Sequence, residues 1–293
     1  MGTTKQDIKQ FALSKGFCDI RFADAGEILA FTKDKVIDPR TLLSSATCII
    51  VLYMRYYPSC PAPEGSMALS SYYIASHRSY HAARDVAAYL ISKGGEALHT
   101  TALPARAAAL RAGGFVGDNG FYYHPEFGSF VCIQTVLTNA FEPDTYPQSL
   151  SACLHCGACE RACPSSGVTD MQKCLRFHIN TSVPEDLRGS VYQLLGCEKC
   201  QSACPLNCAD RDKPYVFALD SLLDGSQTAA IRELVGPNMA RRGRLISQAA
   251  LYAANTSQRQ LLAALWTLAQ SEDEPVRTHA CWAYDKLNGE NND

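Results

Sequence analysis

The chain has 293 residues and a mass of 32.0 kDa, with 47% hydrophobic and 19% charged residues and a formal net charge of −2 at pH 7. This length suits one large domain or two to three smaller ones with real cores. The near-neutral balance excludes a globally basic nucleic-acid-binding protein and a disordered acidic chain. Fourteen cysteines are the unusual feature, because so many thiols need an oxidising compartment or bound metal.

The N-terminal segment indicates the compartment. MGTTKQDIKQFALSKGF carries scattered charges and no apolar core of signal-peptide length, so we expect a cytoplasmic protein. The longest apolar run, near ATCIIVLYM, is too short to cross a bilayer as a helix, and no membrane contact is expected. In a reducing cytoplasm, metal ligation explains the cysteines better than disulfides do.

Helix and strand patterns alternate in the first half of the chain. Apolar residues at helical spacing predict a helix over Thr4–Lys15, with Gly16 as its stop. CDIRFA and TCIIVLY are short and rich in β-branched residues, which predicts two strands, the second buried on both faces. A helical period runs over Ala68–Lys93 and closes at Gly94 and Gly95. EALHTT then predicts a strand, ARAAALRA a short helix and SFVCIQTVLT a strand, so this part is an α/β or α+β domain.

The last part of the chain is almost wholly helical in pattern. SQRQLLAALWTLAQ and EPVRTHACWAYDKL are amphipathic and are joined by the polar break SEDE, which predicts an αα-hairpin similar to a HEAT repeat unit. One such pair is too few for a solenoid, so we expect it to cap the rest of the chain.

Eight cysteines between Cys153 and Cys204 mark a middle module. CLHCGACERACP has the spacing C-x₂-C-x₂-C-x₃-C-P of bacterial ferredoxins, in which three thiolates hold one cubane and the fourth holds the other. GCEKCQSACP adds a C-x₂-C-x₃-C-P group. Two structural Cys₄ zinc sites are the alternative, but the third cysteine and the x₃-C-P ending are not zinc-ribbon spacing. The module therefore predicts two [4Fe–4S] clusters and electron transfer.

The ferredoxin crossing rule divides the eight thiolates between the clusters. The first set is Cys153, Cys156, Cys159 and Cys204, and the second is Cys163, Cys174, Cys197 and Cys200. Cys208 is a spare thiol, or an alternative ligand in place of Cys174. The cysteines without metal spacing are expected to be mostly buried apolar residues: Cys18, Cys48, Cys60, Cys132 and Cys281.

Segments on both sides of this module resemble epoxyqueuosine reductase, the cobalamin-dependent iron–sulfur enzyme family of queuosine biosynthesis. The resemblance is collinear over nearly the whole chain. The segments that resemble the family are DPRTLLSSATCIIVLYMRYY, SHRSYHAARDVAAYL, AALRAGGFVGDNGFYYHPEFGSFVCIQTVLTN, QLLGCEKCQSACPLN and MARRGRLISQAALYAANT with the HEAT-like pair.

The resemblance implies an α+β fold in three domains. These are a nitroreductase-like α/β cobalamin- and substrate-binding domain (1–146), a double-cubane ferredoxin-like domain (147–213) and an α-helical HEAT-like tail (214–293). It also implies cobalamin between the first two domains, with electrons passing from the clusters to cobalt and on to the substrate. That substrate is epoxyqueuosine in tRNA, or another molecule with a reducible carbon–oxygen or carbon–halogen bond.

The resemblance also carries site residues over. Tyr80 and His81 match the family's Tyr-His pair near substrate and cofactor; without the family, His81 and His77 are an ordinary helical i, i+4 pair. Aligning LHTTALPAR through Arg106 puts His99 at the family's proton-donating aspartate, and a histidine can donate a proton near neutral pH. The residues matched to cofactor contacts are Gly117, Asn119, Gly128, Ser129 and Arg106. Glycines fit there because a flat macrocycle packs closely only where side chains are absent.

Other positions depart from the family pattern. Asp118 stands at the lysine of the family's GKN turn, Phe115 at the tryptophan before it, and Gln134 at the glutamate of GEILT. The aspartate could remove a favourable contact to the cobalamin amides or phosphate. The helical tail, which helps to bind tRNA in the family, has one basic cluster here: Arg241, Arg242 and Arg244.

Three functions are compatible with these features, in order of preference. The first is a cobalamin- and [4Fe–4S]-dependent reductase, with His99 as the acid and Tyr80 and His81 lining the pocket. The second is a ferredoxin-like electron carrier or corrinoid redox partner without a substrate of its own. The third is a regulatory or sensor protein with structural or redox-sensing clusters. GGFVGDNG lacks the GxGxxG run of nicotinamide and flavin sites, so an external ferredoxin or flavodoxin is expected as electron donor.

Overall fold

The chain folds as two compact units, each assembled from separate stretches of sequence. The computed structural model describes residues 3–29, 36–147, 152–180, 182–207, 210–211 and 213–289, without the side chains of 179 and 180. The first unit comprises Met1–Tyr56, Ala75–Cys156 and Pro205–Cys208. The second comprises Tyr57–Ile74, Gly157–Cys204 and Ala209–Asp293. The boundaries expected after residues 146 and 213 stay a prediction.

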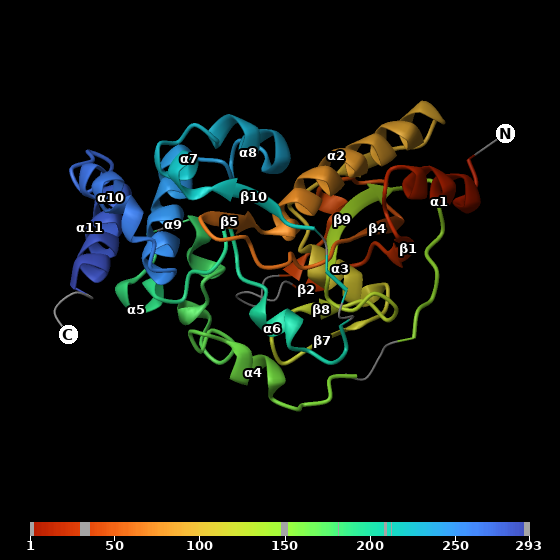
Figure 1. Ribbon diagram of the computed structural model, residues 1–293. Helices are drawn as coiled ribbons and strands as arrows, with labels where there is room; N and C mark the ends of the chain where they lie inside the picture. Colours follow the sequence, from red (N-terminus) through yellow and green to blue (C-terminus); the bar gives the residue numbers. More distant parts are fainter. Residues whose placement is uncertain are drawn as a thin grey trace. The chain divides into compact units, whose positions relative to one another are not determined.

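A four-stranded antiparallel sheet forms the centre of the first unit, in the order β1-β4-β9-β6 (Figure 1). Its strands are β1 (Asp19–Asp24), β4 (Cys48–Arg55), β9 (Val131–Thr138) and β6 (Ala97–His99). β4 is paired on both sides and buried at every residue except Arg55, as its β-branched run predicts. Because side chains alternate along a strand, both faces of this sheet need a cover.

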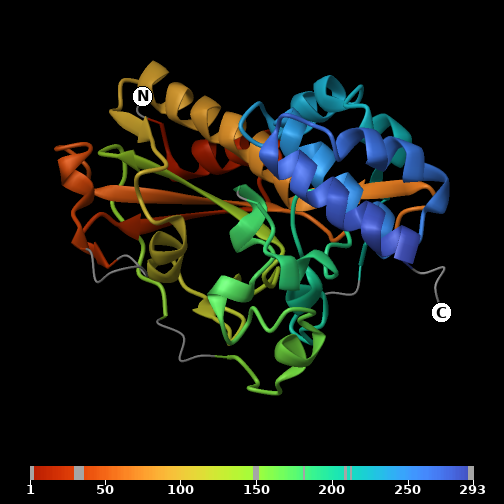
Figure 2. The same ribbon diagram turned by 90° about the vertical axis from the view of Figure 1, so that its left-hand side faces the viewer.

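Helices supply that cover on both faces (Figure 2). The helices are α1 (Lys5–Ser14), α2 (Ser71–Ser92) and α3 (Ala105–Arg111). α3 packs its alanines against Ile49 and Val51 of β4. On the other face α1 lies beside α2, where Phe11 stacks on Tyr89 with ring centroids 4.2 Å apart. Two short strand pairs complete the unit: β2 (Ile28–Leu29) with β3 (Val36–Ile37), and β7 (Phe115–Val116) with β8 (Tyr122–Tyr123).

The ends of α1 follow from its sequence. The Thr4 hydroxyl accepts a hydrogen bond from the Asp7 backbone N–H at 3.1 Å, and the Asp7 carboxylate accepts from the Thr4 backbone N–H at 2.9 Å. This capping box satisfies two donors that the first turn leaves unpaired. At the other end Gly16 has φ +92°, a left-handed conformation that glycine adopts without steric cost.

The long helix α2 begins later than its sequence pattern predicts. The helical period over Ala68–Lys93 is wrong at its start, because Ser66–Leu69 forms strand β5 and the helix begins at Ser71. β5 pairs with β10 (Tyr215–Ala218) in an antiparallel ribbon. This strand also corrects the expectation that the chain after the cysteine module is almost wholly helical. Local periodicity carries no sign of a pairing between segments so distant in sequence.

The second unit is mainly helical. It contains α4 (Ala158–Ala162), α5 (Glu185–Arg188), α6 (Lys199–Ser202), α7 (Leu219–Leu223), α8 (Thr228–Val235), α9 (Arg242–Asn255), α10 (Leu262–Leu268) and α11 (Glu274–Gly289). α10 and α11 form the predicted αα-hairpin, which packs against α9 through Leu265, Ala283 and Leu287. The described residues thus mix sheet and helix, and the expected α+β class is confirmed.

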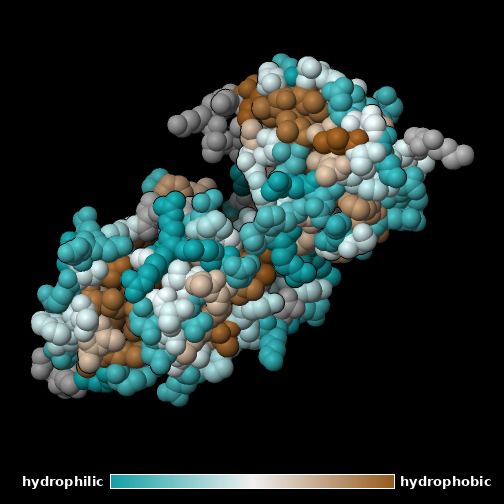
Figure 3. Space-filling model, turned by 90° about the horizontal axis from the view of Figure 1, so that it is seen from above, coloured by the Kyte–Doolittle hydropathy of each residue, from teal (hydrophilic) through white to brown (hydrophobic). Residues whose placement is uncertain are grey.

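The surface is largely hydrophilic with separate apolar areas, as Figure 3 shows for one face. Such areas are ordinary on folded proteins, whose surface is more than half apolar atoms by a rough count. Within the described ranges, none of the helices combines the length and apolar character needed to cross a bilayer.

Candidate functional site

The predicted catalytic residues lie together in the first unit. His99 ends β6 opposite Val136 of β9, so Gln134 is its diagonal neighbour on the same face of the sheet. The His99 Nε2 and Gln134 Oε1 atoms are 3.0 Å apart. The ring of Tyr80, on α2, meets the His99 ring edge-on with centroids 4.9 Å apart. His81 follows, its ring centroid 5.5 Å from that of Tyr80.

These side chains are accessible to a ligand. Tyr80 is 39% exposed and His81 is exposed, while His99 is half-buried. His77, also half-buried, contacts His81 with ring centroids 4.6 Å apart, as neighbouring i, i+4 side chains on a helix do. An imidazole beside a phenol can accept, hold and return a proton, which is the chemistry that a reduction needs at its substrate. The catalytic roles themselves stay predictions.

The β7–β8 hairpin carries the first group of predicted cofactor contacts. Its turn closes through the Gly120 backbone N–H, which donates to the Gly117 carbonyl at 2.8 Å. The Asn119 amide donates to the Tyr123 hydroxyl at 2.9 Å and accepts from the Phe121 backbone N–H at 3.2 Å. The Arg106 guanidinium donates to the Gly120 carbonyl, and burial lowers the pKa of Arg106. These bonds make the turn a rigid element.

The second group sits at the start of β9. Gly128 has φ +66°, and the side chain of Asn207 occupies the place that a Cβ at residue 128 would take. The Ser129 backbone N–H donates to Asn207 Oδ1 at 2.7 Å, and Asn207 Nδ2 donates to the Ser129 hydroxyl at 2.9 Å. Sequence reasoning missed Asn207; its place in CPLN, just after the last cluster cysteine, was the only signal.

These contacts test the fit of a cobalamin to the predicted residues. A Cβ at Gly117 would lie 2.8 Å from the Tyr123 ring, and Gly128 is closed by Asn207. The two glycines are therefore required by the packing of the chain itself, not by room left for a macrocycle. The interpretation of their missing side chains as a corrin surface does not fit this geometry.

Four of the cluster cysteines come together in the second unit. Burial, together with the charges of the neighbouring cysteines, raises the pKa of Cys200 to about 12; these neighbours are Cys197, Cys174, Cys163 and Cys159. Burial likewise raises the pKa of Cys197, with the same effect from Cys174 and Cys163. Four thiolates this close repel one another unless a cation lies between them. The donor set therefore fits a cationic iron–sulfur core, and the assignment of Cys163, Cys174, Cys197 and Cys200 to one cluster stays a prediction.

Backbone groups support this cluster. Although burial alone would raise it, the pKa of Cys163 is lowered by backbone N–H groups of Ser165, Val168 and Gly167. The Gly167 N–H donates to Cys163 Sγ at 3.1 Å. Gly167 also packs on the backbone of Cys174, where a Cβ would come within 2.5 Å of the Cys174 Cα. A glycine is required here because two ligand segments pass close to each other.

The members of the first predicted set belong to different units. Cys153 and Cys156 are in the first unit, half-buried and exposed respectively. Cys159, on α4, and Cys204, directly after α6, are in the second and are half-buried. Their joint ligation of one cluster stays a prediction. Cys208 lies outside the described residues.

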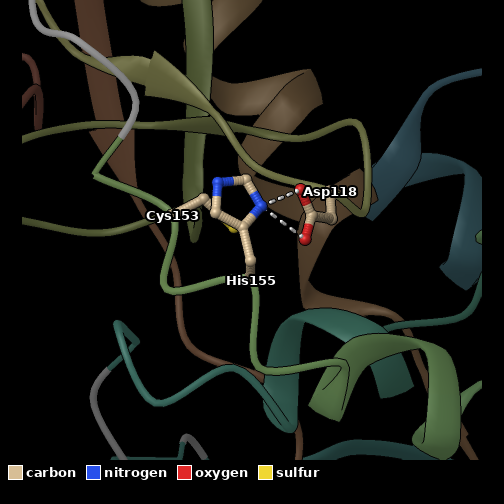
Figure 4. A group of neighbouring side chains, drawn as sticks. All are labelled: Asp118, Cys153 and His155. Carbon is tan, nitrogen blue, oxygen red and sulfur yellow. Dashed lines mark hydrogen bonds and ion pairs between the residues drawn. The ribbon is translucent and has the colours of Figure 1, made fainter.

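Asp118 has a partner that the sequence did not suggest (Figure 4). His155 Nδ1 lies 3.0 and 3.1 Å from the two carboxylate oxygens of Asp118. The ligand atoms of Asp118, His155 and Cys153 all lie within 4.8 Å of one another. His155 has φ +48°, an uncommon conformation for a residue with a side chain. The pair holds the first cysteine loop against the hairpin turn, and its O, N and S donors are also those that bind zinc.

The remaining cysteines only partly match expectation. Cys48 and Cys132 are buried, but Cys18 and Cys60 are half-buried and Cys281 is exposed on α11. Burial raises the pKa of Cys18 to about 11 and that of Cys48 to about 12, so both stay neutral thiols. The expectation of burial is wrong for Cys281, because the buried face of α11 is formed by residues such as Val276, Ala283 and Leu287, and Cys281 lies off that face.

The arginine cluster of the tail serves the fold of the second unit. Arg242 donates to the Asp224 carbonyl at 2.7 Å. Arg244 donates to the Asn238 and Met239 carbonyls at 2.9 and 3.0 Å. Burial and the charge of Arg241 lower the pKa of Arg244. Two of the three guanidinium groups are thus engaged with loop carbonyls.

Known proteins are similar to this chain in sequence and fold. No protein-family model matches it. An epoxyqueuosine reductase of Synechococcus sp. (strain CC9605) is 32% identical over 192 residues, which are 58% of this chain; the chain spans 59% of that relative's length. A solved epoxyqueuosine reductase from Bacillus subtilis is 25% identical with a TM-score of 0.80, covering 97% of this chain and 90% of that one. An epoxyqueuosine reductase solved with an epoxyqueuosine-modified tRNA-Tyr stem loop, 24% identical with a TM-score of 0.81 and the same coverage, shares the fold.

Proposed function

The chain belongs to the epoxyqueuosine reductase family, and from this premise we propose that it is an iron–sulfur reductase acting on epoxyqueuosine in tRNA. The observation that carries the proposal is the electrostatic coupling of cluster cysteines, in which the charges of Cys163 and Cys174 act on both Cys197 and Cys200. With the other four predicted ligands they provide for two [4Fe–4S] clusters, which when bound supply single electrons.

The substrate end of the proposal rests on His99 and its neighbours. Reduction of an epoxide to an alkene removes one oxygen with two electrons and two protons, so an acid is needed at the leaving oxygen. His99 is the proposed acid, and Tyr80 and His81 form the adjoining wall, which the ring contacts of 4.9 and 5.5 Å support. Imidazole suits this role because it exchanges protons near neutral pH.

Cobalamin, tRNA and the electron donor are proposed from the resemblance to the family alone. The five matched residues are Arg106, Gly117, Asn119, Gly128 and Ser129, and their polar groups bond to the chain as described above. A related enzyme has been solved with an epoxyqueuosine-modified tRNA stem loop, which supports tRNA as the partner here. An external ferredoxin or flavodoxin is the proposed electron donor.

A ferredoxin-like electron carrier without its own substrate is the second candidate. It is favoured by one observation, the closure of Gly117 and Gly128 by Tyr123 and Asn207, which a carrier without a corrin would tolerate. The two candidates differ in cobalamin content and in turnover, and both quantities are measurable.

The test is anaerobic purification and reconstitution, with iron, sulfide and cobalamin quantified, followed by an assay of tRNA containing epoxyqueuosine. Two clusters, one cobalamin and conversion to queuosine support the reductase. Two clusters without cobalamin affinity or turnover support the carrier. A full complement of cofactors without turnover points to a different substrate, and loss of activity in H99A with cofactors retained assigns the acid.

A further inference from the structure

The hydrogen bond between His99 and Gln134 is the last in a series of side-chain hydrogen bonds, and the donor and acceptor of each bond follow from the chemistry of its groups. The series starts inside α2, where the Ser79 hydroxyl donates a hydrogen bond to the Ser76 carbonyl at 3.0 Å. Ser79 is completely buried, and a hydroxyl has only one hydrogen to donate. Towards any other partner, Ser79 Oγ is therefore an acceptor.

That other partner is Gln134. Its Nε2 lies 3.1 Å from Ser79 Oγ and donates to it. The carboxamide oxygen of Gln134 then faces His99, 3.0 Å from Nε2. An amide oxygen only accepts hydrogen bonds, so the hydrogen between the two atoms belongs to His99. The reversed amide would put two donors against each other or leave Ser79 without its carbonyl partner.

We infer that Gln134, oriented by Ser79, holds neutral His99 in the Nε2–H tautomer and makes Nδ1 the atom that exchanges protons. Within the part of the chain that the structure describes, no hydrogen bond is seen at His99 Nδ1. Gln134 is thus a positioning residue for the acid, acting through the imidazole and not on the substrate. This role rests on the proposed function, whereas the tautomer does not.

The arrangement makes proton donation simple at His99. In the imidazolium form the second proton is on Nδ1. When the Nδ1–H bond breaks, that proton goes to the substrate oxygen that leaves carbon, and the two electrons come from the external donor through the clusters. The ring returns to the Nε2–H tautomer that Gln134 already accepts from, so no side chain has to turn. Each catalytic cycle then needs one proton back at Nδ1.

The choice of glutamine over glutamate matters for this step. A carboxylate at the same 3.0 Å would stabilise the imidazolium by its charge and so hold the proton. The neutral amide keeps the tautomer without this added stabilisation. In this chain, an acid that must release its proton is paired with an uncharged acceptor.

Nitrogen NMR of the full chain, labelled with ¹⁵N-histidine and reconstituted anaerobically, tests the inference. The seven histidines are distinguished by the signals that disappear in H99Q. At high pH, wild-type His99 is expected to show a protonated Nε2 and an unprotonated Nδ1. Q134L should lose this preference and show a mixture of tautomers, and S79A should weaken it, because the amide is then free to reverse. Q134E should increase the protonated fraction of His99 at a given pH.

Q270E is the matched control, because Gln270 is exposed in the second unit and its variant should leave the His99 signals unchanged. An Nδ1–H tautomer in the wild type, at the signals that H99Q removes, overturns the inference. Retention of the Nε2–H signals in Q134L overturns the role of Gln134. If wild-type His99 shows the Nε2–H tautomer but the protein does not convert tRNA containing epoxyqueuosine, the proposed function alone has failed. If the protein converts this tRNA and His99 shows the Nδ1–H tautomer, the inference about Gln134 alone has failed.

Discussion

His155 donates from Nδ1 to both carboxylate oxygens of Asp118, at 3.0 and 3.1 Å, and so ties the loop of the first cysteine pair to the tip of the β7–β8 hairpin. The position of Asp118 carries a lysine in the family pattern, and a lysine could not accept this bond. The contact that the aspartate was expected to remove is replaced here by a bond within the chain.

D118N should loosen that loop. The side chains of His155 and Asp118 are 67% and 42% exposed, so their pairing is screened and contributes at most about 1 kcal/mol. We expect iron to be released to a chelator up to about 5-fold faster than in the wild type, with unchanged thermal stability. D85N removes the comparably exposed Lys15–Asp85 pair and should release iron at the wild-type rate. Equal rates in D118N and D85N would contradict the role of the pair.

Replacement of Cys174 should cost one cluster. C174S removes a thiolate from the group that also contains Cys163, Cys197 and Cys200, and a cubane with three thiolates is lost or degraded. Iron and sulfide per chain should fall to about half of the wild-type value. C281S, at an exposed cysteine on α11, is the control and should keep full content. Full iron in C174S, with a change only in a C208S variant, would assign the ligand role to Cys208.

Stability should fall as the pH decreases from about 7.5 to 5.5, in part because of His279. Burial lowers the pKa of this histidine, whose Nε2 accepts from the Val183 backbone N–H at 3.1 Å. The unfolded chain therefore binds a proton at higher pH than the folded chain. The stabilisation is fully present above the unfolded value of about 6.5 and is lost as the pH falls below it.

H279N should be less stable than the wild type at neutral pH by about 1–3 kcal/mol, because it disturbs a buried hydrogen bond. Its melting temperature should fall less steeply with decreasing pH, since asparagine has no proton to gain. Thermal unfolding of both proteins at several pH values measures the difference. Parallel pH profiles would mean that other groups cause the acid sensitivity.

Gly128 should resist substitution for structural reasons. G128A puts a Cβ at φ +66° against the Asn207 side chain, and we expect a loss of stability of about 1–2 kcal/mol. G189A is the control, because nothing lies within 4 Å of a Cβ at Gly189. Differential scanning calorimetry compares the two. A G128A protein with normal stability and impaired cobalamin binding would restore the corrin interpretation of this glycine.

Patterns that depend on neighbours in sequence predicted the fold well. The helix over Thr4–Lys15 and the doubly buried strand at TCIIVLY needed only periodicity and a capping residue. The start of α2 was mispredicted because β5 is a strand only through its pairing with β10. A helical period over Ala68–Lys93 is compatible with either structure until that partner is known.

The candidate site shows the same difference between patterns that are local in sequence and contacts that depend on tertiary packing. Ferredoxin spacing predicts that Cys163, Cys174, Cys197 and Cys200 hold one cluster; the charges of Cys163 and Cys174 act on Cys197 and Cys200, and the division of ligands between two clusters stays a prediction. The partners of Asp118 and Gly128, namely His155 and Asn207, are set by tertiary packing, and no spacing rule connects them. The network from Ser79 to His99 joins three elements, which a single sequence cannot align.

The pairing of β5 with β10 also has a consequence for folding during synthesis, because the two strands are made far apart in time. Ser66–Leu69 leaves the ribosome long before Tyr215–Ala218, so its pairing with β10 cannot form while the cysteine module is being made. The second unit begins at Tyr57 and ends in the C-terminal stretch, with part of the first unit in between. Neither unit can therefore be completed during translation before the other has begun.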